Sequence, residues 1–111
     1  MELGILDRLV LAGMLDTYTG NPVNIGILSK VKDNLLISEE EMDKFGIVVD
    51  DRIGNVSWDR NIPNEVEIHI SNRAKRLIAD QLEKLGREDK LTLDHASLCA
   101  KFIGEDENEE E

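Results

Sequence analysis

The chain has 111 residues, enough for one domain with a single modest core and too few for two. Its net charge of −11 suits a cationic or protein partner better than a nucleic-acid backbone, and its single cysteine excludes an intrachain disulfide. Neither a secretion signal nor a run long enough to span a bilayer is apparent, so we expect a soluble, cytoplasmic protein with no membrane partner.

Three helices are predicted in the first half of the chain. Apolar residues at helical spacing place the first over residues 3–15, with Asp7 and Arg8 on the side opposite the apolar stripe. After a polar connection, the same spacing predicts a second helix from residue 23 or 24 to about residue 34.

The third helix has the best-specified start in the chain. Ser38 and Glu41 have the spacing of a capping box, in which each side chain bonds the backbone N–H of the other residue. Ile37 and Met42 occupy the two positions of a hydrophobic staple, and Gly46 is suited to end the helix.

Short β-prone segments follow. Residues 47–49 are β-branched, residues 56–58 alternate apolar and polar, and residues 66–70 alternate with their three apolar residues on one face. We expect 56–58 and 66–70 to pair as an antiparallel hairpin, with 47–49 as a third strand at its edge.

Two helices complete the predicted elements. Ser71 is suited to cap a long helix whose apolar residues recur at steps of three and four, and Gly86 is suited to end it. Thr92 is suited to cap a last helix that runs through Ile103.

The expected fold class is α+β and mostly helical, in the order three helices, β-hairpin, long helix and C-terminal helix. We expect residues 1–104 to form a single globular domain. Residues 105–111 contain six acids and are predicted to be a disordered acidic tail. Three helices followed by a hairpin resemble the winged-helix plan, in which added C-terminal helices make dimers.

Four stretches stand out together: Ile5-Leu6-Asp7-Arg8-Leu9, the Ser38 to Glu41 box before Phe45-Gly46, Val56-Ser57-Trp58, and Lys90-Leu91-Thr92 after the strand and long helix. Together they resemble a pattern in small uncharacterised proteins of phages and prophages. The resemblance covers most of the chain and implies a phage origin. Its residues are nearly all structural, so it implies no catalytic site.

Three cations crowd the first turns of the long helix: Arg73, Lys75 and Arg76. The helix dipole disfavours cations there by a few tenths of a kcal/mol each. They are candidate contacts to an anion or an acidic partner. The alternative, which we favour, is weak surface ion pairing with nearby acids. Those acids are Glu65, Glu67 and Asp80.

The acidic residues on the third predicted helix argue against DNA binding. In a winged-helix protein this helix lies in the major groove, where phosphate contacts require cations. Here it carries Glu39, Glu40, Glu41 and Asp43, with only Lys44 of opposite sign. Nucleic acid is therefore not the expected partner.

No catalytic, cofactor or metal site is predicted. His95 and Cys99 are four residues apart on a predicted helix, but a zinc site needs two further ligands, and no paired histidine or second cysteine is present. The sequence also lacks a glycine-rich phosphate loop and a nucleophile elbow. We therefore expect a protein that is not an enzyme and takes no cofactor.

The leading functional prediction is protein–protein interaction with an unknown partner, including a homodimer through the last two helices. Leu98 and Phe102 belong to an apolar stripe that so small a domain need not cover, and Trp58 is a core residue or an interface anchor. Two alternatives stay open. One is a winged-helix transcription regulator, and the other is a DNA mimic that occupies a host nucleic-acid-binding protein.

Overall fold

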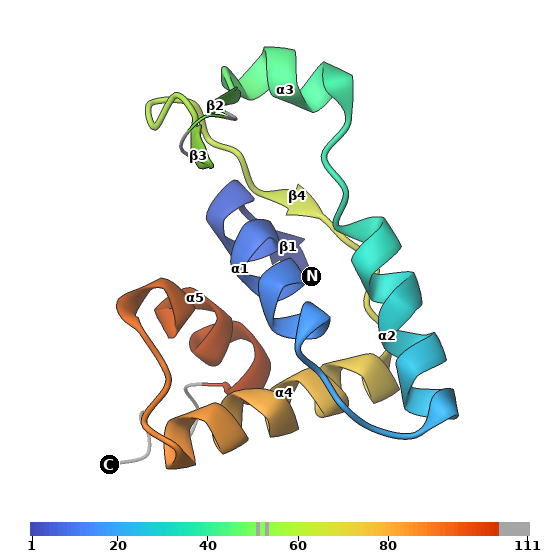
Figure 1. Ribbon diagram of the computed structural model, residues 1–111. Helices are drawn as coiled ribbons and strands as arrows, with labels where there is room; N and C mark the ends of the chain where they lie inside the picture. The colour runs from blue at the N-terminus through green and yellow to red at the C-terminus, as the bar shows by residue number, and fades with distance from the viewer. Residues whose placement is uncertain (51, 53, 105–111) are drawn as a thin grey trace.

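The computed structural model describes residues 1–50, 52 and 54–104, which form an α+β, mostly helical structure (Figure 1). This confirms the fold class expected from the sequence, whereas the predicted tail, residues 105–111, lies outside the described residues. The helical elements are α1 (Ile5–Asp16), α2 (Pro22–Asn34), α3 (Glu39–Phe45), α4 (Asn72–Arg87), the 3₁₀ turn η1 (Leu93–His95), α5 (Ala96–Leu98) and the π-helical turn η2 (Cys99–Ile103). The strands are β1 (Glu2–Leu3), β2 (Val48–Asp50), β3 (Asn55–Ser57) and β4 (Val66–Glu67).

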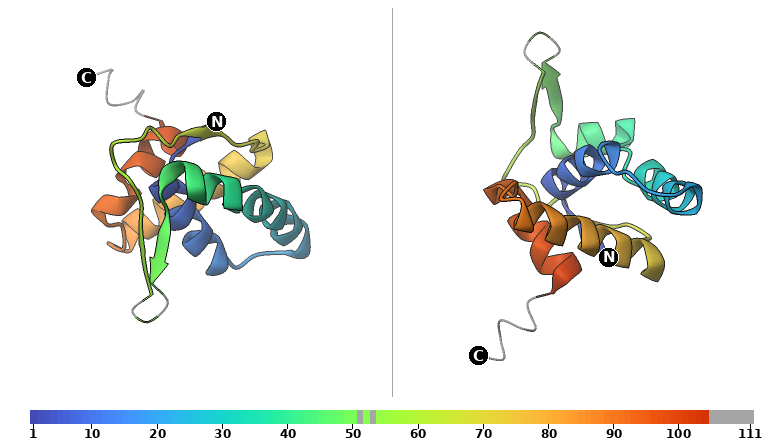
Figure 2. Two further views of the ribbon diagram at one scale, coloured as in Figure 1. Left: turned by 90° about the horizontal axis from the view of Figure 1, so that it is seen from above. Right: turned by 60° about the horizontal axis from the view of Figure 1, so that its bottom comes forward.

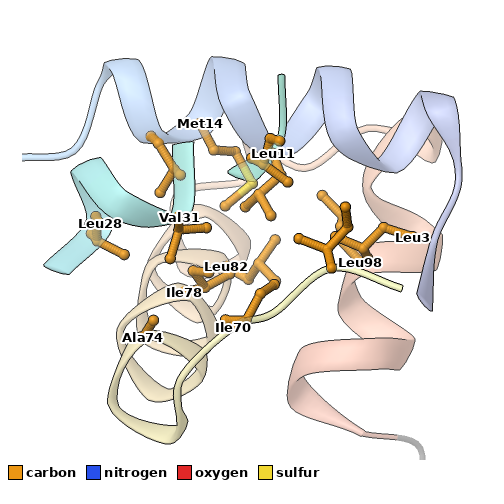
Figure 3. Packing of buried hydrophobic residues seen from close by; sticks show 13 residues of the cluster. Leu3, Leu11, Met14, Leu28, Val31, Ile70, Ala74, Ile78, Leu82 and Leu98 are labelled. Atoms are coloured by element: carbon orange, nitrogen blue, oxygen red, sulfur yellow. The ribbon is translucent and has the colours of Figure 1, made fainter. Parts of the chain in front are cut away.

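The main core is aliphatic and brings together side chains from α1, α2, α4 and α5 (Figure 3). Ala74, Ile78 and Leu82 recur every four residues along α4 and have no exposed surface, as the predicted stripe requires. Leu11 of α1 and Leu98 of α5 are equally buried against them. The long helix is therefore the element on which α2 and the C-terminal turn η2 pack.

A second, smaller cluster lies where the start of α1 meets α3 and the β2–β3 hairpin. It consists of Ile5, Phe45 and Ile47, with Trp58 and Val56 partly buried against it. Because α3 contributes Phe45 and β3 contributes Val56 to this cluster, α3 and the hairpin form one end of the molecule, away from α4 (Figure 1).

The predicted strand pairing is wrong. Strand β3 pairs antiparallel with β2, with Val49 opposite Val56, and not with β4. Strand β4 pairs instead with β1, with Leu3 opposite Val66. The apolar spacing extends the first helix back to residue 3, so it does not reveal that this segment pairs with β4.

Helix α1 begins two residues later than predicted. Gly4 has an extended backbone at the N-cap position, and the Asp7 carboxylate accepts a hydrogen bond from its N–H at 3.2 Å. A Cβ on Gly4 would lie 2.7 Å from Oδ1 of Asn64, which accepts from the N–H of Ile5 at 2.9 Å. Glycine therefore allows the close approach that starts α1 and leaves Leu3 in a strand.

The predicted orientation of α1 is also wrong. Asp7 and Arg8 are buried, at 4% and 2% exposure, whereas Leu6 and Leu9 on the other face are 37% and 36% exposed. The two charged side chains face inward because other segments supply their hydrogen-bonding partners, which the apolar spacing alone does not reveal.

Other helix ends confirm the predicted caps, with two exceptions. Ser38 Oγ accepts from the N–H of Glu41 at 3.1 Å, the Glu41 carboxylate accepts from the N–H of Ser38 at 3.0 Å, and Gly46 is left-handed at φ 64°. Helix α4, however, continues past Gly86 to Arg87. The predicted helix from Thr92 to Ile103 is divided into 3₁₀, α and π turns.

Arg8 joins three elements at the end of α2. Its Nη1 and Nη2 donate to the two carboxylate oxygens of Glu41 at 2.8 and 3.1 Å. Its Nε and Nη2 also donate to the carbonyls of Leu35 and Leu36, at 3.2 and 2.6 Å. Arg8 thus satisfies carbonyls that the end of α2 leaves free and fixes the first turn of α3 against α1.

We expect stability to fall between about pH 5 and pH 2 through Glu41. Hydrogen bonds from Arg8 lower the pKa of Glu41 from 4.5 to about 2, against the opposing effect of burial. Because the pKa is lower in the folded state, the contribution is present above pH 4.5 and is lost as the pH falls toward 2. Urea unfolding at a series of pH values should show that the free energy of unfolding falls less steeply at acid pH in Glu41→Gln than in the wild type. Identical acid limbs would contradict this assignment.

Candidate functional surfaces

The three cations at the start of α4 are not paired with the predicted acids. Glu65 is bound by Lys101 at 2.8 Å, and Glu67 is paired with the N-terminal amino group. In the described part of the chain, no carboxylate lies within 4.0 Å of Arg73, Lys75 or Arg76. The favoured alternative of ion pairing is therefore wrong for these residues.

Arg73 is instead tied to a neutral group on another helix. Its Nη2 donates to Oδ1 of Asn24 in the first turn of α2 at 3.1 Å, and Nδ2 of Asn24 donates to the hydroxyl of Tyr18 at 3.4 Å. Arg73 and Arg76 are exposed, and Lys75 is partly buried. The guanidinium groups therefore keep donors for an anion.

The β2–β3 hairpin presents exposed apolar residues, although the sequence predicts only that they lie in a strand. Val48 and Val49 are 61% and 47% exposed. Figure 2 shows the hairpin extending away from the helices. Among the described residues, each of its strands has only the other as a hydrogen-bonded neighbour. A sheet edge of this kind offers unpaired backbone donors and acceptors to another chain.

The exposed valines stand out among the exposed apolar residues because they are adjacent on an open strand. Leu36 and Val23, at 72% and 64% exposure, are separated from them along the chain, and single exposed apolar residues are normal on a soluble protein. The signal in the sequence was the short β-branched run 47–49, whose burial cannot be judged without knowing its partner strand.

The three candidate interface residues lie in different environments. Leu98 has no exposed surface, so it offers nothing to a partner. Phe102 is partly buried against the main core, in the turn η2 that packs along α4. Trp58 is partly buried in the small cluster, with the Arg60 guanidinium 4.3 Å from its ring centroid. The apolar stripe that suggested a homodimer through the last helices thus packs largely within the chain.

Helix α3 turns an acidic surface to solvent. Glu39, Glu40 and Asp43 are exposed, whereas Glu41 is directed toward Arg8. The N–H of Ile47 donates to the carbonyl of Met42 at 2.8 Å, which places this acidic helix directly beside the start of β2. The open hairpin is therefore flanked by negative charge.

His95 and Cys99 do not form a reactive pair. Nδ1 of His95 accepts from the N–H of Thr92 at 3.0 Å, so this nitrogen takes part in a local cap. Burial raises the pKa of the Cys99 thiol, which disfavours the nucleophilic thiolate. Within the described ranges, no three side chains of histidine, cysteine, aspartate or glutamate converge as a metal site would require.

Each helix in the described part of the chain is too short or too polar to serve as a membrane span. Comparison of the sequence with family models, with curated proteins and with solved structures finds no match.

Proposed function

We propose that this protein works by binding another protein, with the open edge of the β2–β3 hairpin as the docking site. The observation that supports the proposal is the exposure of Val48 and Val49, 61% and 47%, on a strand whose outer edge is free among the described residues. An extended segment of the partner would add a strand there, with main-chain hydrogen bonds for affinity and the valines for apolar contact. A two-stranded hairpin is only marginally stable by itself, so a third strand would also stabilise it.

Charge indicates the chemistry of the partner. The hairpin lies beside Glu39, Glu40 and Asp43, and the whole chain has a net charge of −11. A basic protein would therefore be attracted to this end of the molecule, and two copies of the chain would repel each other. A homodimer is accordingly the weaker form of the proposal. A narrower form of the same proposal is that this protein imitates DNA and binds a host nucleic-acid-binding protein.

The protein would act in the cytoplasm. Its single cysteine, Cys99, supports this location because a reducing compartment suits an unpaired thiol. The resemblance to small phage and prophage proteins makes host proteins the first partners to test. The proposal assigns binding rather than catalysis to the protein.

Replacing both hairpin valines by glutamate should weaken partner binding. Tagged wild type should retain a basic host protein, and Val48→Glu with Val49→Glu should lower the affinity at least about tenfold, equivalent to ~1.4 kcal/mol. Val23→Glu is the matched control, because Val23 is 64% exposed on α2. Retained protein is quantified by mass spectrometry and its affinity by titration.

Two results would contradict the hairpin proposal. One is equal retention of the partner by the hairpin variant and the wild type, with both folded by circular dichroism. The other is loss of the partner in the Val23 control alone. Sedimentation of the purified wild type tests the homodimer separately, and a monomer at micromolar concentration would remove it.

A winged-helix DNA-binding function is a second candidate, favoured by the cations at the start of α4. Arg73, Lys75 and Arg76 lack carboxylate partners within the described residues and would be available to phosphate oxygens. Such binding would weaken steeply with salt. The acidic surface of α3 opposes the winged-helix docking mode, so the duplex would have to approach α4 instead.

A further inference from the structure

Helix α1 turns an apolar stripe to solvent. The exposed positions of this helix recur at steps of three and four, so they share one face. They are Leu6, Leu9, Gly13 and Asp16. Leu6 and Leu9 are 37% and 36% exposed, whereas the charged side chains of Asp7 and Arg8 between them are buried. The usual arrangement of a surface helix, with charges outside and leucines inside, is thus reversed over these residues.

Gly13 leaves the backbone of α1 open within this stripe. A Cβ on Gly13 would meet open space, so nothing in the described part of the chain requires a glycine at this position. Glycine also lowers the stability of a helix interior relative to alanine. The distance between two packed helices depends on the side chains at their contact, so a glycine suits the close approach of a second helix.

The 3₁₀ turn η1 adds apolar surface beside α1. Figure 1 shows α5, and the turn that leads into it, next to α1, and η1 contacts this helix. Leu93, the first residue of η1, is 93% exposed, more than any other large apolar residue in the described ranges. The exposed leucines of α1 and η1 therefore belong to neighbouring elements. We call Leu6, Leu9, Gly13 and Leu93 the α1–η1 face.

The exposed charges on these two elements are negative. Asp16 and Asp94 are exposed, and neither α1 nor η1 exposes a lysine or an arginine. Asp16 is paired with Lys32 of α2, whereas Asp94 has no cation within 4.0 Å among the residues that the structure describes. The net charge of −11 strengthens this field. A cationic partner is therefore favoured, and a second copy of the chain, with the same charge, is disfavoured.

We infer that the α1–η1 face binds a basic amphipathic helix of a partner protein. The bound helix lies along α1 and approaches it most closely at Gly13. Its apolar side chains cover Leu6, Leu9 and Leu93, and its lysines or arginines lie next to Asp94. This contact packs a helix against a helix, whereas the hairpin edge would take an added strand, so it does not depend on the docking proposed there.

A labelled synthetic peptide of leucine and lysine, as long as α1 and with its leucines at helical spacing, is the probe. A peptide of the same composition with alternating leucine and lysine has the same charge but favours a strand, so it controls for non-specific attraction. The protein is titrated to about 1 mM, and fluorescence anisotropy of the peptide reports binding.

We expect the helical peptide to bind at least about tenfold more tightly than the alternating peptide. Equal affinities, or no binding of the helical peptide, would overturn the inference. Tighter binding of the alternating peptide would also overturn it, and would leave the hairpin proposal standing.

Substitutions locate the bound peptide. Gly13→Gln places a side chain on the open backbone and raises the helix propensity of α1. The midpoint of thermal unfolding should therefore rise by a few degrees while the affinity for the helical peptide falls at least about fivefold. A loss of affinity in a more stable protein does not come from unfolding.

Leu93→Gln should weaken binding of the helical peptide without changing stability, because Leu93 is almost fully exposed. Val23→Gln is the matched control on α2 and should bind the peptide as the wild type does. Wild-type affinity in both Gly13→Gln and Leu93→Gln, or an equal loss in Val23→Gln, would refute the site.

Discussion

Replacing Arg8 by methionine is expected to lower the free energy of unfolding by about 3 kcal/mol, the largest effect of any substitution considered for this protein. Arg8 is 2% exposed and donates to Glu41 and to the carbonyls of Leu35 and Leu36. Methionine fills most of the volume but donates nothing, so the carboxylate of Glu41 loses its counter-charge. The Leu35 carbonyl is left in a buried position with one donor fewer.

A positive charge at position 8 should not be sufficient to maintain the stability of the wild type. Arg8→Lys keeps a cation but cannot bond both carboxylate oxygens and the two carbonyls in one planar arrangement, so we expect about half of the loss. Arg76→Met is the matched control, because Arg76 is exposed and has no carboxylate within 4.0 Å in the described part of the chain. The control should change stability by less than about 0.5 kcal/mol.

Denaturant unfolding followed by circular dichroism measures these effects. If Arg8 and Glu41 act as one unit, the double variant with Arg8→Met and Glu41→Gln should lose less than the sum of the two single losses. Strict additivity, or a loss below about 1 kcal/mol for Arg8→Met, would mean that the end of α2 is satisfied in another way.

Local chemistry explains what could be predicted from the sequence. The capping box of Ser38 and Glu41 is complete within four residues, and the N–H of Ala74 donates to Ser71 Oγ at 3.1 Å as expected for a cap. The stripe of α4 needs only the helical repeat. None of these features depends on the position of a distant segment.

The wrong predictions for strand pairing and for the orientation of α1 depend on distant segments. Arg8 is buried because the end of α2 and the first turn of α3 meet it, and no local pattern indicates that meeting. Strand β4 pairs with the start of the chain because Leu3 is buried in the main core there. The N–H of Ile68 also donates to the carbonyl of Met1 at 2.8 Å, which extends this pairing. Strand pairing is a long-range choice that alternation alone does not settle.

For the candidate functional surfaces, too, the residues could be found in the sequence, whereas their pairing and exposure depend on distant segments. The cations of α4 were visible in the sequence, but two of the three acids expected to neutralise them, Glu65 and Glu67, are paired with Lys101 and with the N-terminal amino group. The exposure of Val48 and Val49 follows from the pairing of β2 with β3 and from the absence of a further strand among the described residues. The hydrogen bond from Nε2 of Gln81 to the carbonyl of Met14 likewise joins segments that only the folded chain brings together.

Replacing Lys101 by methionine is expected to lower the free energy of unfolding by about 2 to 3 kcal/mol, the second largest effect. Its Nζ donates to the Asp7 carboxylate at 2.9 Å, to Glu65 at 2.8 Å and to the Glu2 carbonyl at 2.8 Å. Asp7 is 4% exposed, and without Lys101 its carboxylate keeps, within the described ranges, only the hydrogen bond from the N–H of Gly4 at 3.2 Å. A buried carboxylate without its cation is more costly than a lost surface pair.

The alkaline limb gives a second readout for Lys101. Burial alone would lower its pKa, but hydrogen bonds to Glu65 and Asp7 outweigh burial and raise it above 10.5. The stabilisation is therefore complete below pH 10.5 and is lost as the pH rises through the raised value. Lys101→Met, already lacking this contribution, should show a flatter stability profile above pH 10.

Matched substitutions separate the ion pair from packing. Lys30→Met replaces an exposed lysine of α2 and should be nearly neutral. Asp7→Asn combined with Lys101→Met removes the buried charge together with its partner, so it should recover part of the stability that Lys101→Met loses. If the double variant is instead less stable than Lys101→Met, the buried carboxylate of Asp7 is stabilised without Lys101. The C-terminal turns would then be held against α1 by apolar packing alone.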